Sequence, residues 1–442
     1  MKWLPLIATS GFLVFPLGAC DESAESDPPD PEEKFGALQV ADDYDRAVED
    51  LVAETPAKDL REGGQQFAVH VFEQLSSSQA DDNIVLSPLS LSLALGMTMN
   101  GAAGTTVETM LAGLGYEGES LKDVNSYLVE TMRTLQAVEQ VELSIANGIW
   151  ARDDYEPLKR SFYEVVTEGY AADILPLTTV DPINEWVADA THDKIPTILD
   201  DLSGDTAMVL VNALYFNGSW LEAFDEANTT DDAFAAPGGS IDVPTMHGEL
   251  EEARYKKGAD YEAVALSYED EALSLYVFLP NTESSLADFR VGPLGEGTSG
   301  GYYEIDWETS DWVWVDDVSE GLFDGFCSAE VTLGLPKFKV EYERSLEPEL
   351  RAVGLGEIFD APDFSNFSEG KDPFVAEVVQ KTFIDVNEEG TEAAAATAVV
   401  MEDSATAPMP PIEMVVDRPF FFALRDDTTG ALLFVGQITD PS

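Results

Sequence analysis

The stretch that decides the fold is residues 383–401, which read FIDVNEEGTEAAAATAVVM. Alanine is the strongest helix former, so intrinsic propensity favours a helix after Gly390. Strand periodicity gives a different result, because alternate residues are all small or apolar and the charges of Glu392 and Glu402 fall on the opposite face. The residues of the apolar face are Thr391, Ala393, Ala395, Thr397, Val399 and Met401.

This alternation predicts a segment that is an exposed loop in one state and a half-buried strand in another. Only small, uncharged side chains can enter a protein core in this way, because burying an unpaired charge costs several kcal/mol or more. The segment brings no charge into the core until Asp403. Gly390 is the expected hinge, since glycine adopts backbone conformations that other residues avoid.

Helix and strand patterns are intermixed along the rest of the chain. Apolar residues at helical spacing from Phe67 to Leu75 predict an amphipathic helix, and residues 90–99 predict a buried helix. There is no regular strand-helix repeat, so we expect an α+β fold and no doubly wound parallel sheet. The expected strands are residues 83–87, 209–216, 273–279, 331–340 and a final hairpin of 420–424 with 432–438.

The chain is strongly acidic. Acidic residues outnumber basic ones by 85 to 23 among 442 residues, which gives a formal net charge of -62. Such a chain repels duplex nucleic acid and anionic lipid, so no nucleic-acid partner is expected. Two interpretations stay open: the charge keeps a solvated surface from aggregating, or it steers a cationic partner protein toward this one.

The N-terminus predicts export. An apolar stretch too short to span a bilayer follows Lys2, so residues 1–19 are expected to be a signal peptide. The stretch ends in Leu17-Gly18-Ala19-Cys20, which resembles the lipobox of bacterial lipoproteins, in which the cysteine is lipidated. We expect Cys20 to anchor the secreted protein in the bacterial cell envelope, on its periplasmic or extracellular face. Ordinary cleavage near Ala19, which leaves Cys20 free, is the alternative.

Residues 20–42 are acidic, contain several prolines and have little to bury, so they are expected to be a linker. One domain, residues 43–442, is expected to follow, because no comparable linker recurs. Cys327 is the only other cysteine, so a lipidated Cys20 leaves it no partner for an intramolecular disulfide. We expect Cys327 to be a small buried hydrophobic residue.

Several motifs, spread in order along the chain, resemble the serpin family. Glu388–Thr397 resembles the serpin hinge, and Asp417–Phe420 with Phe434–Gly436 resembles the closing signature of the family. The other matches are Asn83–Ser90, Ile183–Ile195, Val211–Trp220, Val243–Met246, Leu335–Phe338 and Asp363–Ser365. The resemblance implies the serpin fold, an α+β fold with a mixed central β-sheet, two further sheets, surrounding helices and an exposed reactive-centre loop.

The resemblance also implies a mechanism. A serpin is a suicide substrate: a protease cleaves the loop, stays attached as an acyl-enzyme, and is distorted when the freed strand inserts into the central sheet. Such a protein is no enzyme and needs no metal or cofactor, and we expect a metastable monomer. The implied hinge residues are Glu389, Gly390, Thr391, Glu392, Ala393, Ala394, Ala395, Ala396 and Thr397. The implied shutter residues are Asn83, Ser87, Ser90, Asn212 and Gln380.

Gln380 departs from the family pattern, which usually has a histidine at this position. Glutamine still donates and accepts hydrogen bonds. We expect a retuned opening of the central sheet, without the pH sensitivity that a histidine would bring.

The usual family spacing beyond the hinge glycine places the reactive-centre bond at Ser404-Ala405. Counting back from the closing signature gives Pro408 or Met409 instead, and Asp403 suits an Asp-directed protease. A small residue before the bond suits an elastase-like or subtilisin-like serine protease, and a cysteine protease is the other target class left open.

A non-inhibitory serpin that acts as a surface binding or storage module is the rival interpretation, although such serpins often carry bulky, charged or proline residues where this loop has small ones. The glycine-rich residues 295–301 mimic nucleotide-binding and serine-hydrolase motifs, but no clear strand precedes them and every histidine lies upstream. Residues 292–325 exceed the family norm. Alternation at 312–315 predicts an extra edge hairpin there, and a protein-binding exosite in this insertion stays open.

Overall fold

A computed structural model describes most of the chain. The described residues are 37–41, 48–53, 55–57, 59–153, 157–202, 206, 208–287, 302–306, 311–315, 322–369, 375, 377–391 and 412–442. Within them, no helix combines the length and the apolar character needed to cross a membrane.

The central sheet has six described strands and mixed directions. Their order is β12 (Phe338–Ser345), β13 (Val379–Val386), β14 (Gly390–Thr391), β4 (Met208–Ser219), β2 (Val141–Ala151) and β3 (Ala172–Pro176). β2 pairs with β3 in parallel and with β4 in antiparallel orientation. The two-residue β14 is the strand that joins β13 to β4.

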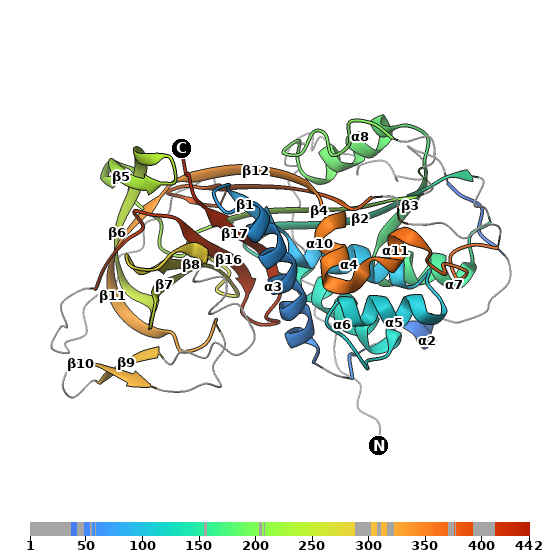
Figure 1. Cartoon of the computed structure of the whole chain (residues 1–442), viewed down its shortest axis with the longest axis horizontal. Helices are drawn as coiled ribbons and strands as arrows, with labels where there is room; N and C mark the ends of the chain where they lie inside the picture. Colours follow the sequence, from blue (N-terminus) through green and yellow to red (C-terminus); the bar gives the residue numbers. More distant parts are fainter. Residues whose placement is uncertain are drawn as a thin grey trace, which may run out of the picture.

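The two faces of this sheet are buried against different layers, because side chains alternate along each strand. On β4, Leu210, Leu214 and Phe216 belong to the main hydrophobic core. The alternate residues Val211 and Ala213 belong to a smaller cluster beneath α8 (Val180–Ala190). Figure 1 shows α8 above the sheet and α4, α5 and α6 on the other side.

The predicted buried helix is α4 (Pro88–Met99), every residue of which is buried. Ser87 caps it, and proline at the first helical position has its φ already set for a helix. The amphipathic helix predicted near Phe67 is α3 (Arg61–Ser78). The other helical elements are α2 (Val48–Leu51), α5 (Gly104–Gly113), α6 (Leu121–Gln136), α7 (Arg160–Glu164), η2 (Val165–Gly169), η3 (Glu226–Asn228), α10 (Glu347–Leu350), η4 (Arg351–Leu355) and α11 (Glu357–Asp360).

The second group of strands forms one continuous network of eleven described strands. The two further sheets that we expected are joined through β6, which pairs with β5, β7, β9 and β11. The members are β1 (Ile84–Leu86), β5 (Thr230–Ala236), β6 (Gly239–Gly258), β7 (Tyr261–Ser267), β8 (Leu273–Pro280), β9 (Tyr302–Asp306), β10 (Asp311–Val315), β11 (Cys327–Pro336), β15 (Ile412–Val415), β16 (Phe420–Asp426) and β17 (Leu432–Ile438). The expected α+β class is confirmed.

Two local findings concern the sequence predictions. The extra hairpin is present, since β9 pairs with β10 in antiparallel orientation and also reaches Lys257 and Gly258 of β6.

Leu38 is buried and Ala41 donates its backbone N–H to the carbonyl of Leu158, 2.8 Å away. Chain on the N-terminal side of the predicted boundary at residue 43 therefore packs against the domain.

Aromatic side chains of β16 hold the second group of strands against the central sheet. The fully buried Phe422 lies 5.5 Å, centroid to centroid, from Phe338 of β12. Phe420 lies 5.7 Å from the same ring, in an edge-to-face arrangement. These contacts connect β12, at the border of the central sheet, to the middle of the other network.

We expect Phe422→Ala to lower the free energy of unfolding by about 3 to 5 kcal/mol, because it leaves a cavity where the two sheets meet. Phe359→Ala, which truncates a partly exposed ring of α11, should cost much less. Denaturant unfolding followed by tryptophan fluorescence measures both, and equal losses would contradict this account of the core.

Candidate functional site

The predicted hinge begins as a strand wedged between β13 and β4. Gly390 faces Ser219, Thr391 faces Gly218 of β4, and Thr391 also pairs with Val386 of β13. A Cβ atom on Gly390 would lie 2.0 Å from the carbonyl oxygen of Gly218. Glycine is required here because the two backbones approach so closely. This close approach is a second reason for glycine, besides the backbone freedom that a hinge needs.

Thr391 is the first residue of the predicted apolar face, and its side chain is buried, with 3% exposed. Its hydroxyl lies 2.6 Å from the phenol oxygen of Tyr268. The Tyr268 ring is stacked on Trp220, 4.6 Å between centroids. Trp220 in turn donates its indole N–H to the carbonyl of Asn387. Burial raises the pKa of Tyr268, so the phenol stays neutral and available for this hydrogen bond.

Glu388 anchors the chain just before the hinge. Its buried carboxylate lies 2.7 Å from Nζ of Lys337 and accepts a hydrogen bond of 2.7 Å from the hydroxyl of Thr229. Burial acts to raise the pKa of Glu388, but the Lys337 and Thr229 hydrogen bonds outweigh it and hold the pKa below its usual value. The backbone carbonyls of Glu388 and Glu389 accept hydrogen bonds from the amides of Phe224 and Trp220.

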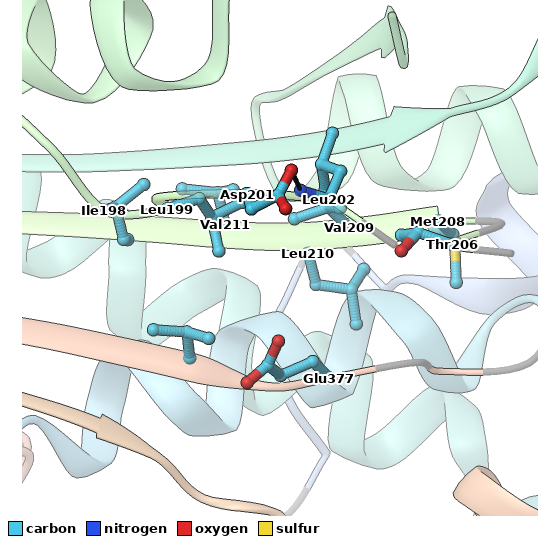
Figure 2. A pocket seen from close by; sticks show the side chains of 11 residues that line it. Ile198, Leu199, Asp201, Leu202, Thr206, Met208, Val209, Leu210, Val211 and Glu377 are labelled. Atoms are coloured by element: carbon cyan, nitrogen blue, oxygen red, sulfur yellow. Dashed lines mark hydrogen bonds between the residues drawn. The ribbon is translucent and has the colours of Figure 1, made fainter. Parts of the chain in front are cut away.

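A slot continues beyond β14, because among the described residues no backbone ladder joins β13 directly to β4. At its far end lies a cavity of about 140 Å³, lined by Met208–Val211 of β4, the start of β13 and residues that follow α8. Figure 2 shows Leu210 and Glu377 reaching into this gap from opposite sides. Among the described residues, the site is thus filled by a strand at the hinge end and by no strand at the other.

The predicted shutter residues divide into three groups. Gln380 accepts a hydrogen bond from the amide of Ser87 and donates one to the carbonyl of Ser87, each 2.8 Å long. The hydroxyl of Ser87 bonds to that of Ser90 at 2.8 Å. Asn212 donates to Asn147 of β2 instead, and its own Oδ1 is buried without a described partner.

Asn83 takes no part in that group. Its amide donates to the carbonyl of Asp440, and its Oδ1 accepts from the amides of Thr439 and Asp440, so it fixes the C-terminus of the chain beside β1. The structure therefore brings Ser87, Ser90 and Gln380 together and separates Asn83 and Asn212 from them.

Gln380 consequently ties β13 to α4, while Asn212 ties β4 to β2. In the described part of the chain, no side-chain hydrogen bond crosses the slot at this level. The segment after α8 spans it on the other face of the sheet. His192 is stacked on Tyr215 of β4 at 4.8 Å, and Nζ of Lys194 lies 5.6 Å from the ring centroid of Phe383 on β13.

Sequence reasoning missed the side chains that hold the hinge: Tyr268, Trp220, Lys337 and Thr229. Trp220 and Lys337 lie within motifs that we quoted, but nothing in the sequence pairs them with the hinge. Cys327 was predicted to be buried, which is wrong: it is partly exposed on β11, where its thiol donates to the carbonyl of Tyr255. Cys327 is the first residue of β11, where the strand covers its side chain only in part.

Other predicted sites lie outside the described residues. They are the lipidation site Cys20, hinge residues Glu392, Ala393, Ala394, Ala395, Ala396 and Thr397, the reactive-centre residues Ser404 and Ala405 with their alternatives Asp403, Pro408 and Met409, and the glycine-rich residues 295–301. Across the described ranges, no three His, Cys, Asp or Glu side chains gather as metal ligands would.

We expect Glu388→Gln to lower the free energy of unfolding by about 1 to 3 kcal/mol at neutral pH, because it removes the buried carboxylate that Lys337 and Thr229 contact. The folded-state pKa of Glu388 lies below its unfolded value, so the stabilisation is present above the unfolded pKa and is lost as the pH falls through the folded pKa. The gap between wild type and variant should therefore close below about pH 4.

Glu389→Gln is the matched control, since no hydrogen bond to its carboxylate is present among the described residues. Thermal melts of both variants at neutral and acidic pH separate them. A loss in Glu388→Gln that equals the control, or that persists unchanged in acid, would contradict the role given to this carboxylate.

Comparison with known proteins shows to which family this chain belongs. The family model described as Serpin (serine protease inhibitor) matches residues 62–441. Human Serpin B8 is 33% identical over 400 residues, covering 87% of this chain and 100% of the relative. An uncharacterized serpin-like protein of Thermococcus kodakarensis is 30% identical over 404 residues, covering 89% of this chain and 88% of the relative.

Solved structures agree. The thermophilic serpin tengpin in its native state superposes with a TM-score of 0.75 at 29% identity, covering 88% of this chain and 96% of tengpin. Human thyroxine-binding globulin complexed with thyroxine has a TM-score of 0.73 at 22% identity, covering 86% of this chain and 98% of that chain, a likeness of fold alone. Because the family match spans almost the whole domain, this chain belongs to the serpin family.

Proposed function

We propose that this protein is a suicide inhibitor of serine proteases that traps its target by inserting the cleaved loop into the slot between β13 and β4. Serpins are in general protease inhibitors and not catalysts. The observation that carries the proposal for this chain is the pairing of Gly390 and Thr391 with β4, because it fixes where a longer inserted strand would lie.

The register follows from that pairing. An antiparallel strand continued beyond Thr391 sets Ala395 opposite Leu214, Thr397 opposite Asn212 and Met401 opposite Met208. Leu214 and Met208 both face the main core. The residues of the loop that share the buried side of Thr391 are therefore the small or apolar ones, and Glu392 falls on the other face.

The slot offers room and partners for such a strand. The cavity of about 140 Å³ lies beside Met208–Val211, at the level that residues 398–401 would reach. The Oδ1 of Asn212, which has no partner among the described residues, lies at the level that Thr397 of an inserted strand would reach, and the threonine hydroxyl would be a donor for it. Insertion adds ladder hydrogen bonds on both sides and fills an existing gap, which supplies the free energy that the mechanism needs.

The residues at the predicted reactive-centre bond indicate the class of the target protease. Ser404-Ala405 suits an elastase-like or subtilisin-like serine protease, with a cysteine protease as the second class. Residues 1–19 and Cys20 support an exported, lipid-anchored protein of a bacterial cell envelope, in which the linker lifts a monomeric inhibitor off the membrane. An inhibitor in that position meets proteases outside the cytoplasm.

Incubation with elastase-type and subtilisin-type proteases should give a covalent complex that survives SDS, because the acyl-enzyme is trapped before water releases it. Mass spectrometry of the released C-terminal fragment locates the cleaved bond, and we expect the fragment to begin at Ala405. Cleaved chain without complex would instead support the storage or binding module.

We expect Ala395→Glu to leave cleavage intact but to abolish trapping, because the register would bury its carboxylate beside Leu214. Glu392→Ala is the matched control, since this residue falls on the opposite face, beside the partly exposed Asn217, and the variant should still trap. Nicked wild type should melt at a higher temperature than the intact chain, and nicked Ala395→Glu should not. Equal trapping by the two variants would overturn the alternation on which the mechanism rests.

A further inference from the structure

Among the described residues, Leu221 is the one large hydrophobic residue that is exposed and not at least partly buried, with 49% of it open to solvent. It directly follows Trp220 at the end of β4, and its amide donates to the carbonyl of Ser267 of β7. Its neighbours Trp220 and Phe224 donate backbone hydrogen bonds to Glu389 and Glu388. Leu221 therefore sits on a rigid corner next to the start of the reactive loop.

A shallow hollow of about 60 Å³ opens beside Leu221. Leu250 of β6 and Leu266 of β7 contribute to its walls, and Glu222 and Glu252 line it as well. The hollow lies where the pairing of β6 with β7 ends, at Arg254 and Ala265, while β6 continues to pair with β11. An apolar group of a partner that covers Leu221 would thus find further apolar atoms to contact.

Acidic side chains predominate around the hollow. Partial burial raises the pKa of Glu222, and the nearby carboxylates of Glu251 and Glu252 raise it further. No described Lys or Arg forms an ion pair with these three. Arg254 also lines the hollow, but its guanidinium is engaged by Asp427 at 2.9 Å. The protein holds three repelling carboxylates next to an exposed leucine, and a cation from outside relieves that repulsion.

We propose that Leu221, Glu222, Glu251 and Glu252 form a docking surface, here called the Leu221 surface, for a basic rim of the target protease. This rests on the proposed function, because the partner is the protease that occupies the adjacent loop. The complementary partner presents Lys or Arg side chains around an apolar group, next to its substrate groove. Opposite charges at such a rim raise the association rate and strengthen the encounter complex.

Other occupants are disfavoured by charge. A second copy of this chain carries the same formal charge of -62, so two such surfaces repel each other. Anionic lipid and nucleic acid are repelled for the same reason. A neutral partner would cover Leu221 but would leave three carboxylates crowded and partly desolvated, which costs free energy.

The test separates docking from trapping. The full-length chain is mixed with a strongly cationic elastase-type serine protease whose active-site serine is replaced by alanine, and the dissociation constant is measured from about 50 to about 300 mM NaCl, a range over which screening grows. The triple variant Glu222→Gln, Glu251→Gln, Glu252→Gln should bind about tenfold more weakly at low salt, and the difference should vanish at high salt. Leu221→Ala should weaken binding to a similar extent at all salt concentrations.

The matched control is the triple variant Glu108→Gln, Glu117→Gln, Glu130→Gln. It removes the same charge from exposed residues of the α5–α6 region, which lies far from β5 and the end of β4 in Figure 1. If both triple variants bind alike, only the global charge acts and the Leu221 surface is refuted. The active protease is assayed in parallel. Salt-dependent docking without a covalent complex would contradict the proposed function but not the docking surface. A covalent complex that forms equally well with the Leu221-surface variants would contradict the docking surface alone.

Discussion

The rest of the structure depends on a single short pairing, the two residues of β14 held between β13 and β4. A strand this short contributes few hydrogen bonds, so its position is maintained by the side chains around it. Glu388 is fixed by Lys337 and Thr229, and Thr391 by Tyr268. These contacts define the register of any strand that follows, and no described strand occupies the rest of the slot. The trapping mechanism that we propose depends on this fixed start.

The middle of the slot is arranged differently from what the family resemblance implied. Glutamine at position 380 reaches both backbone groups of Ser87, which a single imidazole ring at that position would not do in the same way. It therefore fastens β13 to the cap of α4 and leaves Asn212 to bond with β2. The described contacts that span the two sides of the slot are those at the hinge end and those of the segment after α8, where Lys194 lies over Phe383.

The acidic composition has two consequences at different scales. Spread over the surface, a formal charge of -62 opposes aggregation and the association of like copies. In the Leu221 surface that we propose, the same charge would give an approaching protease a preferred orientation. A protein whose mechanism begins with an encounter gains from the second effect, since a correctly oriented encounter presents the bait to the active site.

The sequence by itself determined the α+β class, the α4 and β4 segments and the hairpin of β16 and β17, because each of these depends on local periodicity or on turn residues. The alternation after Gly390 stays a prediction beyond Thr391, where the described part of the hinge ends. Only the tertiary structure decided which partners hold the hinge. The residues that contact the hinge are far from it along the chain: Lys337, Thr229 and Tyr268. Asn83 and Asn212 form hydrogen bonds with Asp440 and Asn147, which no periodicity in the sequence indicates. Pairwise contacts between distant segments are set by how the sheets pack, and a one-dimensional pattern does not contain that information.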